Sequence, residues 1–438
     1  METPTEITKQ TEINQETIHE LQKTIKDIAC LTDFLSKNLS KDISKLMEVI
    51  LTASIILEAS DIHFEPEQKK VKFRLRIDGI LHDIFFFEIA DYKAILSRIK
   101  LLSGIMLNIT DKAQDGRFTI LFNQKPIETR VSSLPSEYGE TIVMRILDPK
   151  SLIEAEKLGI RQDMIEIFEK EIRQPNGMII VTGPTGSGKT TTLYAILKKI
   201  QNPEIKIITI EDPIEYHLEG ISQSQVNPKK GYSFVTGLEA IVRQDPDVIL
   251  VGEIRDFETA QIALQASLTG HLVLTTLHTN DATGTIVRLM ALGEKPNNIA
   301  PALNLAIGQR LIRKICPSCQ QEKQATEKEL TRIKKETEAL PKDVKEKIKL
   351  PIIGPSLKIP KPRGCQKCNN TGYKGRIGIF EFFLNDDEME GFIAKSPNIA
   401  ELKQKAKEKG MATMKQDGII KVLQGITSLE EVEKATGE

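Results

Sequence analysis

Apolar and polar residues alternate strictly in one stretch of the chain. Positions 71 to 77 read Val-Lys-Phe-Arg-Leu-Arg-Ile, and this period of two predicts a half-buried β-strand. Asp78-Gly79 then signals a tight turn, so a second strand from Ile80 to Phe87 is expected to complete a hairpin. Helical spacing recurs near residues 49–56 and 95–105, and further strand patterns lie at 118–122, 127–132 and 141–147. Residues 46–150 are therefore predicted to form a mixed α/β domain.

The first 45 residues are polar but carry a narrow apolar stripe at helical spacing, formed by Ile18, Leu21, Ile25, Ile28 and Leu35. This spacing predicts an N-terminal helical leader over residues 1–45, with the first dozen residues disordered. The stripe either docks on a partner or packs against the protein's own domain, and the sequence leaves both roles open.

Continuous apolar runs replace the alternation between residue 151 and about residue 310. The runs Met178–Thr182, Lys206–Ile210, Val248–Val251 and Leu272–Thr276 alternate with helical segments. This pattern predicts a largely parallel sheet that is covered by helices on both faces. Ligands of such sheets bind at the carboxyl ends of the strands. The tail from Asp386 to Glu438 is charged and is predicted to be helical.

Length, charge and hydropathy exclude several classes of protein. A chain of 438 residues exceeds one ordinary core, so two or three domains are expected. The 60 Lys and Arg nearly balance the 61 Asp and Glu, so no global field draws the chain to nucleic acid or anionic lipid. No apolar run approaches the roughly 20 residues that span a bilayer, and the polar N-terminus does not resemble a signal peptide. The protein is expected to be cytoplasmic.

The residues after the first of these strands carry the main candidate chemistry. They read Gly183-Pro184-Thr185-Gly186-Ser187-Gly188-Lys189-Thr190-Thr191 and lead into a helical run. In this context the pattern indicates phosphate binding, because the glycines let successive backbone N–H groups converge on a polyphosphate at a helix N-terminus. Lys189 is expected to reach the β- and γ-phosphates and Thr190 to coordinate Mg²⁺. The alternative is a glycine-rich turn that binds nothing.

Polar residues follow the other three strands, as Glu211-Asp212, Gly252-Glu253 and Leu277-His278. Hydrolysis of a triphosphate requires an oriented water and compensation for charge on the γ-phosphoryl oxygens. Glu253 is favoured as the catalytic carboxylate and Glu211 as its partner, although the sequence does not separate the two roles. His278, ahead of His271, is expected to sense the γ-phosphate, with a structural hydrogen-bonding role as the alternative.

Four of the five cysteines form two C-x-x-C pairs, Cys316 with Cys319 and Cys365 with Cys368. In a reducing compartment these pairs predict four thiolates around Zn²⁺ rather than disulfides. Because the protein fills all four positions, the metal is expected to be structural and not catalytic. A redox-active C-x-x-C pair is the alternative.

Longer runs around these residues resemble the secretion ATPase superfamily. The runs Gly183 to Thr191, Ile210 to Tyr216, Arg243 to Asp256 and Thr269 to Asn280 are similar to its Walker A, Asp box, Walker B and His box. The cysteine pairs, Thr371 to Arg376, Gln416 to Gly418 and Gly425 to Thr427 resemble the branch with the type II secretion ATPase and the type IV pilus assembly (extension) ATPase. The resemblance runs from about Ser60 to the C-terminus.

This resemblance implies a particular architecture and activity. A PAS-like α/β domain at 46–150 would precede a RecA-like P-loop domain at 151–438, which includes a zinc module at 312–380 and a C-terminal helical region at 386–438. The chain would form a homo-hexamer that hydrolyses ATP with Mg²⁺. It would lie at the inner face of the cytoplasmic membrane, bind inner-membrane platform proteins and no nucleic acid, and power type II secretion or type IV pilus assembly.

In this family, arginines of the smaller domain close over the nucleotide, and Arg130 and Arg145 lie in the matching runs. Their guanidinium groups would stabilise developing phosphoryl charge, and surface salt bridges are the alternative. Arg243 and Arg255 are further candidates at a subunit interface. The region before Asp61 is shorter than the docking domain usual in this branch, so the docking mode and the choice between secretion and pilus assembly stay open.

Rival functions predict other signatures. A RecA-like nucleic-acid translocase is expected to carry a basic stripe or stacking aromatic residues, but this chain has balanced charge, 5% aromatic residues and no Trp. A GTP switch or small-molecule kinase is disfavoured because no N-K-x-D run for guanine is present. A pilus retraction ATPase of the same superfamily shares the mechanism, but the cysteine pairs favour the assembly branch. Measured turnover would exclude a non-hydrolysing ring subunit.

Overall fold

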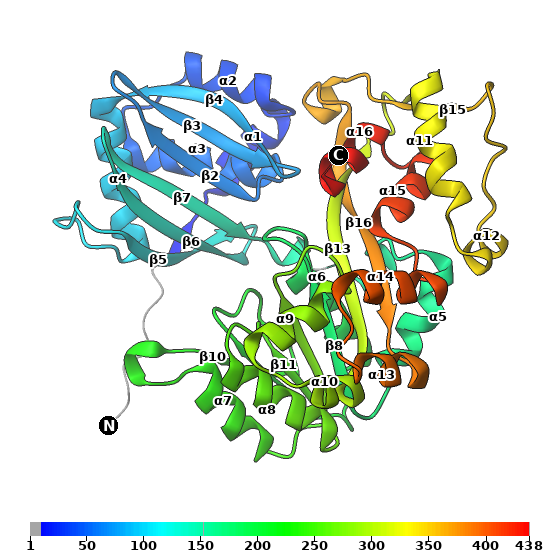
Figure 1. The fold of residues 1–438 in the computed structure, drawn as a ribbon. Helices are drawn as coiled ribbons and strands as arrows, with labels where there is room; N and C mark the ends of the chain where they lie inside the picture. Colours follow the sequence, from blue (N-terminus) through cyan, green and yellow to red (C-terminus); the bar gives the residue numbers. More distant parts are fainter. Residues whose placement is uncertain (1–9, 152, 438) are drawn as a thin grey trace. The chain divides into compact units, whose positions relative to one another are not determined.

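The computed structural model describes residues 10–151 and 153–437. They divide into two compact units that are not continuous in sequence. The first unit contains the chain up to Ser151 together with Cys316–Cys319 and Arg363–Lys374, and the second contains the other segments. Figure 1 allows the chain to be followed through both units. The two cysteine pairs thus group with the N-terminal part of the chain.

The first unit is built on a seven-stranded sheet in the order β1-β5-β6-β7-β2-β3-β4. Its strands are β1 (Gln10–Glu12), β2 (Asp61–Pro66), β3 (Lys70–Ile77), β4 (Ile80–Glu88), β5 (Gln114–Phe122), β6 (Lys125–Ser136) and β7 (Gly139–Leu147). Its helices are α1 (Gln15–Thr24), α2 (Ile28–Lys37), α3 (Ile43–Ile56) and α4 (Ile89–Ser103). All neighbouring strands are antiparallel except β1 and β5. The predicted hairpin is present as β3 and β4, joined at Asp78 and Gly79, which both have positive φ.

The apolar stripe of the predicted leader is part of the core of this unit. Ile18, Leu21 and Leu35 are buried in the same hydrophobic cluster as Phe64 and Phe73 of the sheet. Of the two roles left open by the sequence, the structure shows packing on the protein's own domain. The predicted disorder of the first dozen residues falls mainly on residues 1–9, which lie outside the described residues, whereas residues 10–12 form β1.

The second unit is built on a sheet in the order β10-β9-β11-β12-β8-β13-β16. Its strands are β8 (Gly177–Thr182), β9 (Ile207–Glu211), β10 (Ser222–Gln225), β11 (Val248–Val251), β12 (Leu272–Leu277), β13 (Leu303–Ile315) and β16 (Tyr373–Leu384), and β14 (Gln321–Gln324) pairs with β15 (Lys358–Lys361) in a separate ribbon. The strands from β10 to β13 in this order run parallel. The four strands predicted from the sequence are all present and begin or end within one residue of the predicted bounds.

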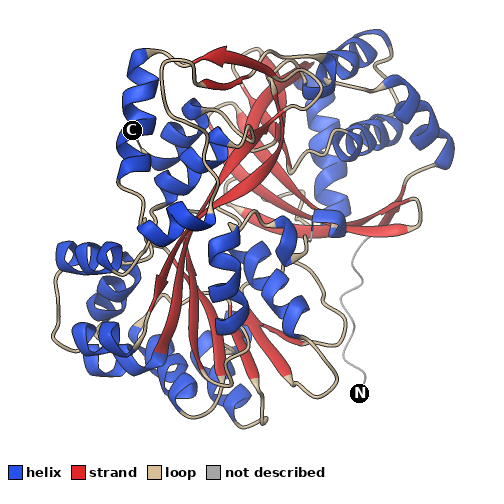
Figure 2. Ribbon diagram, turned by 90° about the vertical axis from the view of Figure 1, so that its right-hand side faces the viewer, coloured by secondary structure: helices blue, strands red, loops and turns tan. Residues whose placement is uncertain are grey.

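Helices cover both faces of this sheet (Figure 2). The helices of this unit are α5 (Gln162–Glu171), α6 (Lys189–Ile200), α7 (Phe234–Val242), α8 (Phe257–Leu268), α9 (Gly284–Leu292), α10 (Pro296–Ala302), α11 (Glu327–Glu338), α12 (Lys342–Lys347), α13 (Asp387–Ile393), α14 (Ile399–Glu408), α15 (Met414–Leu423) and α16 (Leu429–Thr436). Ile249 and Val251 pack in one hydrophobic cluster and Val248 and Leu250 in another. A strand buried on both faces explains why these runs are apolar throughout and do not alternate.

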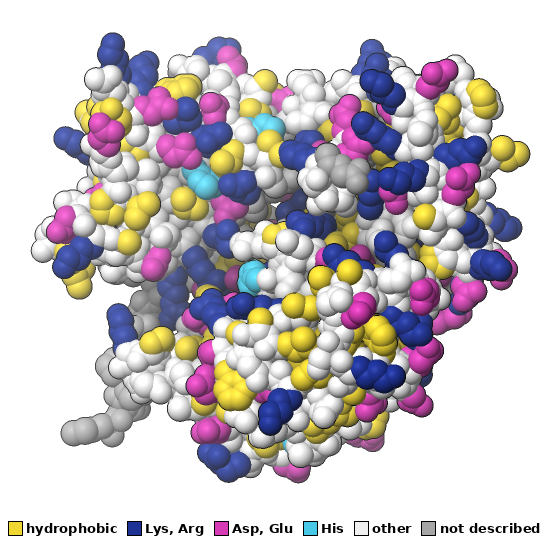
Figure 3. All heavy atoms as spheres, in the orientation of Figure 1, with side chains coloured by type: hydrophobic (Ala, Val, Ile, Leu, Met, Phe, Trp, Pro, Cys, Tyr) yellow, Lys and Arg dark blue, Asp and Glu magenta, His cyan; other side chains and the backbone are white. Residues whose placement is uncertain are grey.

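The surface agrees with the balanced composition. Basic and acidic side chains are interspersed over the face of the molecule shown in Figure 3. Among the helices of the described residues, we find none with both the length and the apolar character that a bilayer span requires.

Candidate functional site

The glycine loop lies between β8 and α6, at the carboxyl edge of the parallel sheet. Gly186 has a φ of +79°, and apart from its chain neighbours no atom lies within 4 Å of the position that a Cβ would occupy. Its backbone therefore faces open space. Gly183 is packed instead, because a Cβ there would lie 2.4 Å from the carbonyl oxygen of Gln309 on β13. The loop is thus supported from one side and accessible from the other, as a phosphate cradle requires.

Lys189, the first residue of α6, is half-buried within this loop. Its Nζ donates hydrogen bonds to the carbonyl oxygens of Gly183 at 2.9 Å and Pro184 at 3.2 Å. Burial lowers the pKa of Lys189, and the nearby carboxylate of Glu253 partly opposes this effect. The buried Oγ of Ser187 has no hydrogen-bond partner among the described residues. A cation and an unsatisfied hydroxyl beside open backbone fit a bound polyphosphate.

Glu253 follows the end of β11 and lies beside Lys189. Its carboxylate is 3.6 Å from Nε2 of His278 and accepts a hydrogen bond from Arg255. Burial and the positive charge of Lys189 lower the pKa of His278, against a smaller opposing effect of Glu253. Lys189 therefore interacts electrostatically with both residues, so the three side chains form one charged group beside the glycine loop.

Glu211 is the last residue of β9, and its side chain points into a separate polar network. It is 3% exposed and accepts hydrogen bonds from the hydroxyl of Thr209 at 2.6 Å and from the hydroxyl of Tyr194 on α6. Gln223 on β10 donates a further bond at 3.3 Å. Burial raises the pKa of Glu211, although these donors partly offset the effect. None of these contacts is with Lys189, Glu253 or His278.

The remaining candidates lie in different places. Thr190 and Thr191 are in the first turn of α6, and Thr190 is exposed. His271 precedes β12, at the opposite edge of the sheet from His278, and its Nδ1 lies 2.9 Å from the carbonyl oxygen of Ala266. This contact corresponds to the structural alternative. Arg243 is the C-cap of α7, and its side chain makes no contact with the residues around Lys189 among the bonds of the described chain.

Arg130 and Arg145 belong to the first unit. They lie directly opposite each other on β6 and β7, on the same face of that sheet. Nε of Arg145 is 2.9 Å from Oδ1 of Asp61, and the Arg145 side chain is 56% exposed. The pair forms a local concentration of positive charge beside one buried carboxylate.

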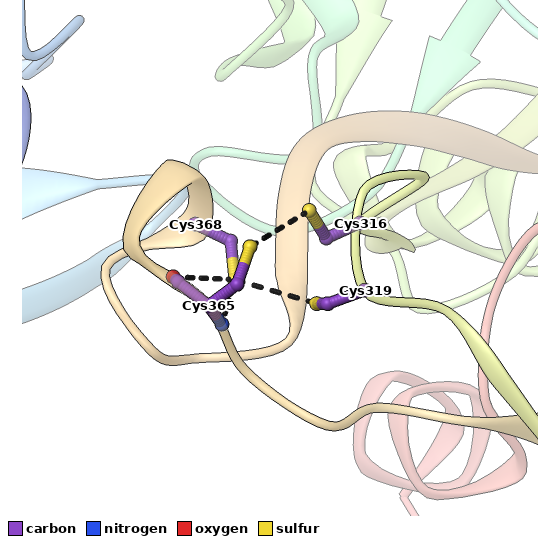
Figure 4. Close-up of side chains that lie close together, drawn as sticks. All are labelled: Cys316, Cys319, Cys365 and Cys368. Atoms are coloured by element: carbon purple, nitrogen blue, oxygen red, sulfur yellow. Dashed lines mark hydrogen bonds between the residues drawn. The ribbon is translucent and has the colours of Figure 1, made fainter.

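The four predicted cysteines converge, as Figure 4 shows. Their Sγ atoms all lie within 4.8 Å of one another. Cys365 and Cys368 are 3.8 Å apart, as are Cys319 and Cys368, and Cys316 and Cys365 are 4.0 Å apart. A tetrahedron with metal–sulfur bonds of about 2.3 Å places its sulfurs about 3.8 Å apart. The four residues are free thiols, and their geometry fits Zn²⁺.

Backbone groups and a helix surround this cluster. The N–H groups of Cys365 and Gly372 lie 3.2 Å and 3.3 Å from Sγ of Cys368. Burial raises the pKa of this thiol, but the two N–H groups together with hydrogen bonds from the thiols of Cys365 and Cys319 outweigh it and lower the pKa to about 7. Oδ1 of Asn369 accepts a hydrogen bond of 2.8 Å from the N–H of Ile28, the first residue of α2. The cysteine cluster is therefore tied to the N-terminal helices.

Two supporting residues were not identified from the sequence. Gln309 on β13 accepts a hydrogen bond from Oγ1 of Thr192 at 2.7 Å and packs against the glycine loop. Tyr194 on α6 donates a hydrogen bond to Glu211. The available signal was that Gln309 and Arg310 interrupt an apolar run, but the partner of Gln309 is 117 residues away in sequence.

A parallel sheet with a glycine loop after β8 and a carboxylate after β11 defines a P-loop nucleotide-binding protein. The chain matches the family described as "Type II/IV secretion system protein" over residues 37–434, and it belongs to this family.

Named relatives come from two kinds of machine. The chain is 41% identical over 407 residues to the type II secretion system protein E of Aeromonas hydrophila, covering 93% of this chain and 78% of that protein. It is 44% identical over 392 residues to the type IV pilus assembly ATPase PilB of Thermus thermophilus, covering 89% of this chain and 42% of that protein. The chain thus spans less than half of this pilus relative.

Solved structures share the fold. The pilus retraction motor PilT with bound ADP superposes with a TM-score of 0.60 at 26% identity, covering 89% of this chain and 96% of that one. The ATPase DotB of Legionella pneumophila superposes with a TM-score of 0.63 at 22% identity, covering 89% and 95%.

Proposed function

We propose that this protein is a motor ATPase that hydrolyses ATP to ADP and phosphate and powers assembly of a type II secretion pseudopilus or a type IV pilus. The grouping of Lys189, Glu253 and His278 beside an open glycine loop carries the proposal. Relatives named as a type II secretion ATPase in Vibrio cholerae, at 41% identity, and as a pilus assembly ATPase support the same activity.

The residues of the site would have separate roles in binding the nucleotide and in hydrolysis. Lys189 and the backbone N–H groups of the loop from Gly183 to Thr191, apart from Pro184, which has none, would hold a triphosphate, and the exposed Thr190 would hold Mg²⁺, which neutralises phosphate charge when bound. Glu253 would orient the attacking water and accept its proton. The lowered pKa of His278 favours a neutral ring, which can donate one hydrogen bond towards the carboxylate of Glu253.

We assign Glu211 a positioning role. Its carboxylate fixes Tyr194 on α6 and Gln223 on β10, so it would hold the neighbouring strand ends in place without touching the attacking water. This assignment gives different roles to Glu211 and Glu253, which the sequence alone did not distinguish.

Replacing the two glutamates tests this division. Glu253→Gln is expected to lower the rate of phosphate release about 100-fold, the scale of a lost general base, while fluorescent ATP analogues still bind. Glu211→Gln keeps the shape of the buried side chain and is expected to lower the rate much less. If Glu211→Gln abolishes turnover and Glu253→Gln does not, the two roles are reversed.

We further propose that the first unit is the PAS-like domain and the second the RecA-like domain of a hexameric ring, with Arg130 and Arg145 acting on the nucleotide. The support is their shared position on one face of the β6–β7 pair and the ability of guanidinium groups to clamp phosphate. Light scattering with Mg²⁺ and a non-hydrolysable ATP analogue should report a mass of six chains. Co-purification from membranes should identify an inner-membrane platform protein and so the machine served.

Arg130→Ala is expected to reduce kcat by at least about tenfold, because a guanidinium group that compensates phosphoryl charge is lost. Lys125→Ala, at the exposed start of the same strand, is the matched control and should leave kcat unchanged. If Arg130→Ala and Lys125→Ala have the same kcat, Arg130 does not act on the nucleotide, and the alternative role in a surface ion pair is supported instead. The midpoint of thermal unfolding, measured for both variants, separates loss of activity from loss of the fold.

A further inference from the structure

A cavity of about 420 Å³ in the second unit shares no residue with the glycine loop. It is lined by the segment before α5, the end of α12, β16, and α15 with the residues that follow it. Four of its lining residues are cations, namely Arg161, Lys347, Lys349 and Lys421. Four more are isoleucines, and none of its described lining residues is acidic. α5 and α12 lie close together in Figure 1.

Arg161 is the most buried cation of the cavity wall apart from Lys421. Its side chain is 4% exposed, and its Nε and Nη2 donate to the carboxylate of Asp163 at 2.9 Å and 2.8 Å. Nη1 lies 3.3 Å from Oδ1 of Asp417 but outside hydrogen-bond geometry, and it has no hydrogen-bond partner among the described residues. A buried guanidinium with an unsatisfied donor is costly unless a further acceptor binds there.

The N-terminus of α5 opens beside this guanidinium. α5 is 10 residues long, and its N-cap, Arg161, makes no side-chain capping bond. The first backbone N–H groups of a helix have no partner within the helix and carry partial positive charge, so they favour an anion. Gln162, the first residue of α5, lines the cavity.

The acids closest to these cations do not line the cavity and are paired with them. Asp163 pairs with Arg161 and Glu166 with Lys347, both at 2.8 Å, and Asp417 pairs with Lys421 at 2.7 Å and lies 3.3 Å from Nη1 of Arg161. Lys349 has no acidic partner among the described residues. Four cations thus meet three acids, and Lys349 is the cation of this group without an acidic partner among the described residues.

We propose that this cavity binds a small phosphate-bearing molecule. Its phosphate would sit between the N-terminus of α5, Nη1 of Arg161 and the ammonium of Lys349. Its apolar part would contact Ile160, Ile348 and Ile377. The volume lies within the range of about 300 to 1,000 Å³ that is typical of small-molecule sites. The site is separate from the proposed ATPase site and does not depend on that assignment.

Calorimetric titration of the full chain carrying Lys189→Ala tests the proposal, because this background weakens phosphate binding at the glycine loop. The probes are inorganic phosphate and phenyl phosphate. We expect saturable binding of one equivalent of each, with phenyl phosphate the tighter because its ring contacts the isoleucines. Adding Lys349→Gln should weaken both by about tenfold, the scale of one charge-assisted hydrogen bond.

Lys342→Gln is the matched control, since Lys342 is exposed at the start of α12 and does not line the cavity. It should leave both affinities unchanged. Hydrogen exchange of residues 159–162 and 347–349 should slow when phenyl phosphate is added. Absence of saturable binding, equal affinity for the two probes, or equal effects of Lys349→Gln and Lys342→Gln would each overturn the proposal.

Discussion

Lys189→Ala is expected to reduce ATP hydrolysis to background while the protein stays folded. The ammonium of Lys189 sits inside the glycine loop, where it is held by the carbonyl oxygens of Gly183 and Pro184. Alanine removes the cation that we propose to contact the phosphates, at a half-buried position where water replaces it poorly. The loss of a preorganised charge of this kind costs roughly 100-fold or more in rate. Release of inorganic phosphate from ATP and Mg²⁺ measures the effect.

Lys198→Ala is the matched control, because Lys198 lies on the exposed face of the same helix. Its turnover should equal that of the unmodified protein. Circular dichroism and the midpoint of thermal unfolding should show that both variants fold. Turnover of Lys189→Ala within about twofold of the unmodified protein would contradict the nucleotide site and, with it, the proposed function.

The second large effect is expected from the metal centre. Purified protein should contain about one zinc per chain, and Cys368→Ser should lose it, because Cys368 lies within 4.0 Å of two other sulfurs of the cluster. Structural zinc contributes roughly 10 kcal/mol or more of apparent free energy in small peptides. We therefore expect the segments 316–319 and 363–374 to unfold locally and the midpoint of thermal unfolding to fall.

Local unfolding should reach α2, since Asn369 accepts the hydrogen bond from the N–H of Ile28. Hydrogen exchange at the start of α2 should therefore speed up in Cys368→Ser or after chelation. Cys30→Ser is the control: Cys30 is outside the four-cysteine cluster, and the variant should keep its metal. Protein without stoichiometric metal by elemental analysis, or unchanged exchange in α2 after metal loss, would contradict this account.

Several elements were predictable because their signals are local. The alternation at 71–77 and the Asp78-Gly79 turn predicted the β3–β4 hairpin, and four apolar runs predicted β8, β9, β11 and β12. The spacing of the C-x-x-C pairs predicted that the thiols would meet, although the pairs are 49 residues apart. In each case the residues that set the structure are neighbours in sequence, or their chemistry allows few partners.

Other features depend on partners that the sequence does not identify. β13 was not predicted, because Asn304, Gln309 and Arg310 interrupt its apolar pattern and only pairing with β8 fixes it as a strand. From the sequence, the apolar stripe of the N-terminal leader could dock on a partner or pack in the protein's own core. The structure shows it packed against the sheet of the first unit. Glu211 and Glu253 both lie at the carboxyl ends of buried strands, so only the positions of Tyr194, Thr209 and Lys189 distinguish their surroundings.

The amino-acid sequence by itself determined that this chain has a glycine loop between a buried strand and a helix, acids after neighbouring strands, and four thiols in metal-binding spacing. Only the tertiary structure decided which acid faces Lys189, which helix the cysteine cluster supports, and that four cations surround a cavity at the start of α5. The physical reason is that hydrophobic period and turn chemistry act over a few residues, whereas side-chain direction is set by packing between segments far apart in the chain.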